Sequence, residues 1–258
     1  MRPLRLPGHP FLRRWPLSFM LLAACAGLHA EAVQVAVAAN FAGPMTAITA
    51  VFEKDTGHKA LLSFGATGKF YAQIKSGAPF DVFLAADEKT PLRLADEGLA
   101  VASTSFTYAT GRLVLWSARP DFVDAQGQVL KTGRFDRLAI AAPTLAPYGA
   151  AALETLTQLG LQNALGAKIV QGESIGQTFN FVYSGNAELG FVALSQVIEH
   201  GQGSSGSKWV VPASLYSPLH QDAVVLVHGK KNRAAEALMA FLKTEKARAI
   251  IRAFGYEL

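Results

Sequence analysis

The stretch from Val33 to Met45 reads VQVAVAANFAGPM, and its two halves differ in character. Apart from Gln34, the residues from Val33 to Ala38 are apolar, which is typical of a buried strand. A helix with Pro44 in its first turn is expected soon afterwards, because proline is tolerated at that position. Asn40 therefore stands between a strand and a helix N-terminus, where backbone N–H groups can hold an anion.

The rest of the chain repeats this order of strand and then helix. Gly57 is expected to end the first helix at about residue 56. Further strands are expected at 59–64, 81–84, 112–116, 138–142, 168–170, 188–193 and 222–227, and further helices after Gly65 and at 88–97, 149–159, 175–183, 233–243 and 245–253. This alternation predicts an α/β fold with mostly parallel sheets flanked by helices. The stretch 201–207, GQGSSGS, is expected to be a surface loop.

Two sets of such units predict a protein of two lobes. The chain is expected to cross between the sets near residue 110 and to return near residue 220. This places residues 33–110 and 220–258 in a first lobe and residues 111–219 in a second. In sheets of this kind, ligands bind at the carboxyl ends of strands, where the helices begin. A ligand cleft between the lobes follows.

The first thirty residues predict an export signal. They contain four arginines and no acidic residue, followed by an apolar run that is too short to span a bilayer stably. The small-residue pattern at 30–32 suits cleavage, so residues 1–32 are assigned to a signal peptide and the protein to the periplasm. The residues from Leu22 to Cys25 also resemble a lipoprotein processing box. A lipid anchor at Cys25 is therefore the alternative.

The charge balance argues against a nucleic-acid partner. Removing the four signal arginines from 24 basic residues leaves 20, against 19 acidic residues. Binding to nucleic acid needs a basic face, which a nearly neutral chain lacks. Cys25 is the only cysteine and lies within the signal, so no disulfide is expected. The histidines show no spacing typical of a metal site.

Four strand-to-helix turns are candidates for a binding site: Ala39-Asn40, Ala66-Thr67-Gly68, Pro147-Tyr148-Gly149 and Ser174-Ile175-Gly176. Each offers backbone N–H groups at a helix start, and Asn40 and Thr67 add neutral side-chain donors. None contains an arginine or a histidine. Donors without a counter-charge suit a fully deprotonated oxyanion, because each of its oxygens can only accept. Helix capping alone would explain any one of these turns. Lys69, near one of them, is expected to be solvated.

A serine hydrolase is the main rival to a binding protein. The motif GESIG around Ser174 fits the G-x-S-x-G pattern of a nucleophile between a strand and a helix. Asp222 and His228 follow in the required order, but they would lie roughly 20 Å apart on one extended strand. His200 and His220 remain as partners without a matching acid. We therefore expect a binding protein and not an enzyme.

Five stretches together carry a resemblance to a known family: VAVAANFAGPM at 35–45, SFGATGKFYAQIKSGAPFDVFLAAD at 63–87, APYGAAALETL at 146–156, GESIGQTFNFVYSGNAELGFVALS at 172–195 and FLKTEKARAIIRAFGY at 241–256. They are similar to the periplasmic molybdate-binding proteins of ABC transporters. The resemblance extends over nearly the whole chain after the signal.

The resemblance implies a type II periplasmic-binding fold whose two lobes close on a tetrahedral dianion. Carried over position by position, the first lobe would offer Asn40, with the Ala39 backbone beside it, and Thr67. The second lobe would offer backbone N–H groups at Tyr148 and Ile175. These are the turns that the helix-start argument also selects.

The resemblance also implies a ligand and partners. The ligand would be molybdate or tungstate, with another tetrahedral oxyanion such as sulfate as the alternative. The protein would hold no cofactor and no free metal cation, and it would deliver the anion to the permease of an ABC importer as a monomer. In part of the family a tyrosine completes the shell. Here that position is Ala193, for which no direct role is expected.

Overall fold

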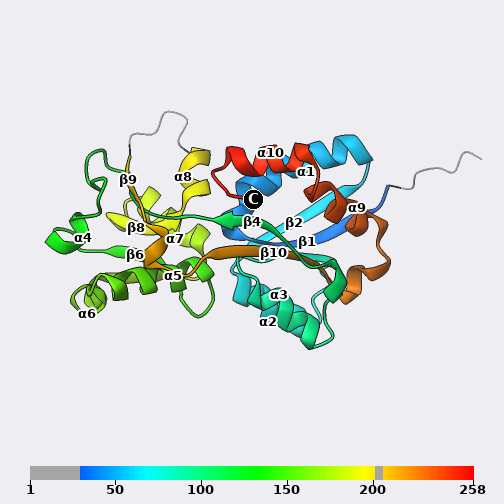
Figure 1. Ribbon diagram of the computed structural model, residues 1–258, viewed down its shortest axis with the longest axis horizontal. Helices are drawn as coiled ribbons and strands as arrows, with labels where there is room; N and C mark the ends of the chain where they lie inside the picture. The colour runs from blue at the N-terminus through cyan, green and yellow to red at the C-terminus, as the bar shows by residue number, and fades with distance from the viewer. Residues whose placement is uncertain (1–29, 201–205) are drawn as a thin grey trace, which may run out of the picture.

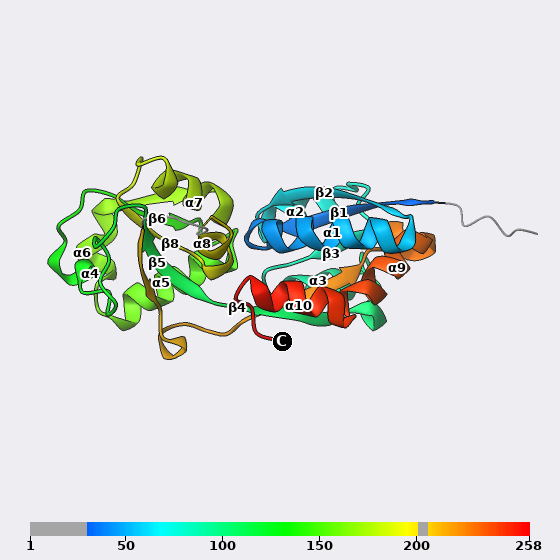
Figure 2. The ribbon, with the colours of Figure 1, turned by 90° about the horizontal axis from the view of Figure 1, so that it is seen from above.

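The computed structural model describes residues 30–200 and 206–258, which form two lobes lying side by side (Figure 1). A view from above shows the same division (Figure 2). The predicted signal peptide up to residue 29, including Cys25, lies outside the described residues, as does most of the stretch 201–207. The expected α/β architecture of two lobes is confirmed.

Lobe 1 is built on a five-stranded sheet with the order β2-β1-β3-β10-β4. Its strands are β1 (Ala32–Ala38), β2 (Lys59–Gly65), β3 (Val82–Leu84), β4 (Phe106–Gly111) and β10 (Leu219–Val225). β1 is parallel to β2 and β3, whereas β10 is antiparallel to β3 and β4. In Figure 1 one face of the sheet carries α1 (Ala42–Thr56), α9 (Arg233–Leu242) and α10 (Glu245–Ala253), and the other carries α2 (Thr67–Lys75) and α3 (Lys89–Asp96).

Lobe 2 has a second five-stranded sheet with the order β7-β6-β8-β5-β9. Its strands are β5 (Leu113–Ser117), β6 (Leu138–Ala141), β7 (Ile169–Gly172), β8 (Leu189–Ala193) and β9 (Ser207–Val210). β6 is parallel to β7 and β8, and β5 is antiparallel to β8 and β9. The helices are α4 (Val129–Thr132), α5 (Pro147–Gln158), α6 (Gln162–Leu165), α7 (Ile175–Tyr183) and α8 (Leu194–His200). The chain enters lobe 2 between β4 and β5 and leaves it between β9 and β10.

Several elements differ from the sequence-based expectation. The strand β4 and the helix α8 were not expected, and both are fixed by contacts with distant segments rather than by a local pattern. Helix α1 begins at Ala42, which places Pro44 in its first turn as expected, whereas α5 begins at Pro147 and not at Gly149. Proline suits the first position of α5, because its missing N–H would have no partner there.

Helix α1 shows how periodicity sets burial in lobe 1. Met45, Ile48 and Phe52 repeat on one face of the helix and are fully buried, as expected. The helix ends at Gly57, whose φ of 75° forms the left-handed cap that glycine favours. Phe52 makes an edge contact with Phe241 of α9, with ring centroids 5.6 Å apart. The apolar face of α1 therefore packs in the core of lobe 1, and this packing fixes the position of the turn that precedes the helix.

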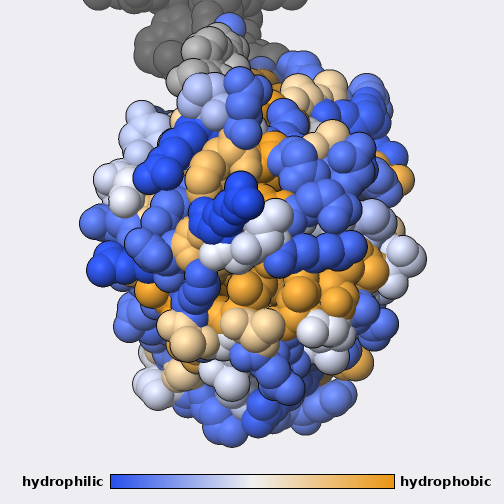
Figure 3. Space-filling view, turned by 90° about the vertical axis from the view of Figure 1, so that its left-hand side faces the viewer, coloured by the Kyte–Doolittle hydropathy of each residue, from blue (hydrophilic) through white to orange (hydrophobic). Residues whose placement is uncertain are grey.

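The outer surface of lobe 2 carries both hydrophilic and hydrophobic residues. At the end of lobe 2, hydrophobic residues form a band that hydrophilic residues interrupt and surround (Figure 3). Within the described ranges, none of the helices combines the length and the apolar character needed to cross a membrane.

Gly149 allows the start of α5 to lie directly on β6. A Cβ atom at this position would lie 2.1 Å from the carbonyl oxygen of Ala141, which belongs to the backbone of that strand. Because a backbone atom cannot move aside as a side chain can, the helix start would have to shift. The small residue thus fixes where the first turn of α5 points.

We expect Gly149→Ala to lower the free energy of unfolding by about 1–3 kcal/mol, the usual cost of overpacking. Gly166→Ala is the matched control, because a Cβ atom there meets nothing within 4 Å. The control should leave stability unchanged or raise it by about 0.4–1 kcal/mol. Urea unfolding of both variants measures the difference. Equal stabilities would show that the approach of α5 to β6 is not tight.

Candidate functional site

A small cavity lies between the lobes where four helix starts meet. Its lining comes from the short helical turn Ala39–Phe41 before α1, the starts of α2, α5 and α7, and the ends of neighbouring strands: Ala38, Ala39, Asn40, Gly65, Ala66, Thr67, Ala86, Ala146, Pro147, Tyr148 and Ile175. All five residues predicted from the sequence are in this lining. The cavity has a volume of only about 10 Å³, which suits a small compact ligand better than an extended organic molecule.

Thr67 is the first residue of α2 and is 2% exposed. Its Oγ1 accepts a hydrogen bond from the backbone N–H of Ala86 at 3.0 Å. A hydroxyl has one proton, and in this contact the proton is not used. Thr67 can therefore accept from the protein and donate toward the cavity at the same time, which is the polarity that a bound anion requires.

The starts of α5 and α7 contribute backbone donors from lobe 2. The first N–H groups of a helix have no acceptor within that helix. Pro147 has no N–H, so the N–H of Tyr148 is the first that α5 can present. Ile175 is the first residue of α7, and its carbonyl oxygen accepts from Gln196 Nε2 at 3.2 Å. Gln196 of α8 thus helps to hold the start of α7 in place.

Asn40 lines the cavity, and two residues behind it engage its amide nitrogen. Its Nδ2 donates to Gln221 Oε1 at 2.8 Å and to the hydroxyl of Tyr256 at 3.1 Å. Neither of these residues lines the cavity. Asn40 Oδ1 is buried and has no hydrogen-bond partner among the described residues. The amide nitrogen that was expected to face an anion is therefore engaged elsewhere in this structure.

The polar residues behind Asn40 were missed by the sequence argument. One signal was available for Gln221, because Leu219, Gln221 and Ala223 alternate along a strand with apolar neighbours on the same face. A polar residue on the inward face of a strand is a candidate for a buried network. No local pattern points to Tyr256.

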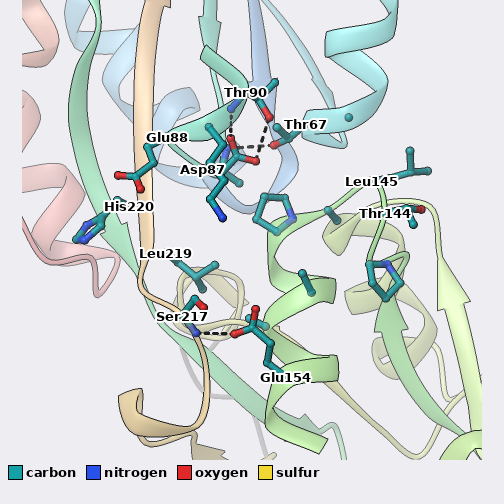
Figure 4. Close-up of a pocket in the computed structure, with 18 of the residues that line it drawn as sticks. Thr67, Asp87, Glu88, Thr90, Thr144, Leu145, Glu154, Ser217, Leu219 and His220 are labelled. Atoms are coloured by element: carbon teal, nitrogen blue, oxygen red, sulfur yellow. Dashed lines mark hydrogen bonds between the residues drawn. The ribbon is translucent and has the colours of Figure 1, made fainter. Parts of the chain in front are cut away.

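The cavity carries no formal charge. Among the described residues, none with a charged side chain lines it. A second, more open cavity of about 240 Å³ adjoins it and shares Thr67 with it. Figure 4 shows this outer cavity, with Asp87 in the upper part of the view, His220 at the left and Glu154 at the bottom. These titratable groups therefore line the outer cavity and not the inner one.

Asp87 is a partly buried carboxyl group in this outer cavity. Burial raises its pKa, and hydrogen bonds from the Thr90 N–H at 2.7 Å and the Thr90 hydroxyl at 3.1 Å act in the opposite direction. The loss of hydration outweighs these bonds. The folded protein thus favours the neutral form of Asp87 more than the unfolded chain does.

The residues of the rival hydrolase site, Ser174, Asp222 and His228, each form hydrogen bonds with other residues and not with one another. Ser174 Oγ accepts from the N–H of Gln177 at 3.2 Å and is the N-cap of α7. Asp222 accepts from the hydroxyl of Thr107 at 2.6 Å, and His228 pairs with Asp81 at 2.8 Å. No triad forms from these groups, because each is engaged with another partner. The motif around Ser174 is a helix cap.

Two further sequence expectations concern residues beside the site. Lys69 does not line the cavity but forms an ion pair with Glu173 of lobe 2. Ala193 is fully buried at the end of β8, and its N–H donates to Gln196 Oε1 at 3.1 Å. It does not line the cavity.

The two hinged lobes and the small donor-lined cavity define a protein that binds a solute between lobes. The family described as bacterial extracellular solute-binding protein matches residues 33–257, and the chain belongs to this family. It is 59% identical over 237 residues to the molybdate-binding protein ModA of Azotobacter vinelandii, covering 92% of this chain and 94% of the relative. It is 51% identical to ModA of Rhodobacter capsulatus, covering 87% of each chain.

A solved structure agrees with these relatives. The periplasmic molybdate-binding protein of Azotobacter vinelandii superimposes with a TM-score of 0.85 at 45% sequence identity, covering 88% of this chain and 99% of that chain. The resemblance drawn from the five sequence stretches is thereby confirmed. Solute-binding proteins of this family are transport proteins and not enzymes, as expected.

We expect Asp87→Asn to stabilise the protein at neutral pH. The folded-state pKa of Asp87 is raised, so its contribution to stability is present at low pH and is lost as the pH rises through that value. The asparagine carries no charge to dehydrate and can still accept from Thr90. The melting temperature of the variant should therefore exceed that of the wild type increasingly as the pH rises from about 4 to 8.

Asp121→Asn is the matched control, because Asp121 is exposed and the substitution removes the same charge. Its melting temperature should follow that of the wild type across the same pH range. If Asp87→Asn behaves like the control, burial of Asp87 has no energetic consequence.

Proposed function

We propose that this protein captures molybdate outside the cytoplasm and delivers it to an ABC importer. The observation that carries the proposal is the meeting of helix starts from both lobes at one cavity without a charged lining. The identity to molybdate-binding relatives supports the choice of ligand.

The donor set explains why a deprotonated oxyanion is the ligand. In our proposal, the backbone at Ala39 and the side chains of Asn40 and Thr67 act from lobe 1, and the N–H groups of Tyr148 and Ile175 act from lobe 2. Helix starts place partial positive charge at the cavity. A ligand that still carried a proton would bind less well, because its O–H would be buried without an acceptor.

Ligand binding favours the closed arrangement of the lobes. At the rim of the cleft, the Gly68 N–H donates to the carbonyl oxygen of Leu145 at 2.9 Å across the lobes, and Lys69 pairs with Glu173. The side chains of Lys69 and Glu173 are 43% and 67% exposed, and such pairs contribute little. An anion that bonds to both lobes interacts only with the closed form and so shifts the population toward it. The moving units in this proposal are residues 33–110 with 220–258 and residues 111–219.

The remaining features of the transport cycle follow from this assignment. Residues 1–32 direct export to the periplasm and are removed, with lipidation at Cys25 as the alternative. The closed monomer docks on a membrane permease, and a separate subunit hydrolyses ATP. Tungstate binds nearly as well as molybdate, because it has the same charge and almost the same size. No cofactor takes part, and molybdenum is bound only through its oxygens.

Calorimetric titration of the exported protein tests the choice of ligand. Molybdate and tungstate should bind tightly, and sulfate and phosphate should bind weakly, because a cavity set for the larger anions leaves the oxygens of sulfate too far from some donors. Tight sulfate binding with weak molybdate binding would overturn the proposed substrate.

The hydroxyl of Thr67 is expected to contribute directly to affinity. Thr67→Val keeps the shape of the side chain and removes the donor, so molybdate affinity should fall by about 1.5–3 kcal/mol, the usual value for a hydrogen bond to a charged group. Thr67→Ser keeps the hydroxyl and should stay close to the wild type. Calorimetry on both variants gives the comparison. Wild-type affinity in Thr67→Val would remove this hydroxyl from the ligand shell.

A further inference from the structure

Gln221 is a fully buried amide at the point where β10 meets the return crossing from lobe 2. The register of β10 against β4 shifts between Gln221 and Asp222, so the strand is irregular at this position. Gln221 Oε1 accepts from Asn40 Nδ2 at 2.8 Å and from the hydroxyl of Tyr108 at 3.0 Å. Its Nε2 donates to the hydroxyl of Tyr148 at 3.1 Å. One side chain therefore joins a cavity residue of lobe 1 to a cavity residue of lobe 2.

The neighbouring strand leaves room for this contact. A Cβ atom at Gly111 would lie 2.0 Å from the Tyr148 hydroxyl and 2.5 Å from Gln221 Nε2. Any side chain at position 111 would therefore separate the two groups. The glycine is at the end of β4, where the chain crosses to lobe 2.

Asn40 is held from a second direction as well. Its carbonyl oxygen accepts from the hydroxyl of Ser195 in lobe 2 at 2.8 Å and from the hydroxyl of Tyr256 at 2.7 Å. The backbone of Asn40 is thus fixed from both lobes. The remaining freedom of this residue is the direction in which its amide group points.

The two ends of the Asn40 amide have opposite effects on an anion. In the present orientation, Nδ2 is engaged with Gln221 and Tyr256, and Oδ1 is buried without a partner. An acceptor beside a bound anion would repel it, whereas the N–H group would stabilise it. A half-turn of the amide exchanges the two ends, provided that each neighbour can reverse its role.

All neighbours of Asn40 in this network are able to reverse. The Gln221 amide can turn in the same way, so that Nε2 donates to Asn40 Oδ1 and Oε1 accepts from the Tyr148 hydroxyl. Tyr108 then accepts from Gln221 and still donates to the carbonyl oxygen of Ala85, from which it lies 2.9 Å. The Tyr256 hydroxyl turns its one proton from the Asn40 carbonyl oxygen to Asn40 Oδ1, and the carbonyl oxygen keeps its hydrogen bond from Ser195. The Asn40 amide nitrogen is then free to face the ligand.

We propose that Gln221 is a positioning residue for the anion, which turns together with Asn40 so that the Asn40 amide nitrogen faces the ligand. This inference rests on the proposed function of Asn40 as a ligand-binding residue. Gln221 itself does not touch the anion, since it does not line the cavity. It affects the affinity for the anion through the orientation of the Asn40 amide, and it links that orientation to Tyr148 in the opposite lobe.

A double-mutant cycle with molybdate as the titrated ligand tests this role. Gln221→Met keeps the length of the side chain and removes both of its polar ends. In the wild-type background it should weaken binding by about tenfold or more, as should Asn40→Ala. In the Asn40→Ala background, Gln221→Met should weaken binding by less than about twofold, because its effect passes through the missing amide.

Thr155→Val is the control for the loss of a buried polar group. Thr155 is fully buried, and its hydroxyl donates only to the carbonyl oxygen of Ala151 in its own helix at 2.8 Å. The control should retain wild-type affinity. If Gln221→Met does not fold, Tyr148→Phe replaces it in the cycle, because it removes the lobe 2 end of the network and keeps the backbone N–H at the cavity.

An NMR signal adds a measurement that a purely structural role would not change. The side-chain amide signal of Asn40, identified by its loss in Asn40→Ala, should move when molybdate is added to the wild type. In Gln221→Met this shift should be smaller, because the amide is no longer held by a partner that can reverse.

The outcomes separate the two proposals. If the wild type does not bind molybdate, or if Asn40→Ala binds as well as the wild type, the proposed function of the site is wrong. If Asn40→Ala weakens binding but Gln221→Met does not, or if the two losses simply add, the positioning role of Gln221 is overturned. An Asn40 signal that molybdate does not move also overturns it.

Discussion

The structure depends on one constraint, which is that an anion must be held between two lobes by donors that carry no formal charge. Partial charges at helix starts act only at short range, so several of them must point at one small space. This explains why the cavity is lined largely by alanine and by the first residues of helices. It also explains the close packing at Gly68, where a Cβ atom would lie 3.1 Å from the backbone of Leu145 in the other lobe. Small residues let the backbones of the two lobes approach each other around the ligand.

The lack of charged side chains in the lining of the inner cavity contributes to selectivity among anions. A cationic side chain would attract anions of any shape or protonation state, whereas fixed N–H groups favour a ligand that only accepts. The acidic side chains of the outer cavity, Asp87 among them, lie beside the site without lining it. The exposed ion pair between Lys69 and Glu173 lies outside the cavity and contributes little to holding the lobes together.

The buried network behind the cavity joins the site to the crossings between the lobes. Asn40 and Tyr148 bind from opposite lobes, and Gln221 lies between them on the strand that returns from lobe 2. A network of amides and hydroxyls has a property that an ion pair lacks, since each member can exchange donor and acceptor roles. The protein can therefore keep these groups satisfied while one donor becomes free for the ligand. The same contacts that rigidify the hinge region thus take part in recognition.

The sequence by itself determined the features that depend on neighbouring residues. The alternation of strands and helices indicated the α/β class, and Gly57 and Ser174 marked a helix end and a helix start. The five residues predicted from the four turns all lie in the lining of the cavity, because strand ends and helix starts are local patterns. Only the tertiary structure decided what faces those turns. Asn40 and Gln221 are 181 residues apart in the chain, and no local pattern could show that the amide nitrogen of one is held by the other. The antiparallel strand β4 was missed for the same reason, since its place in the sheet is set by pairing with β10. Hydrogen bonds across the fold, and not the residue types alone, decide which atom of Asn40 is available to a ligand.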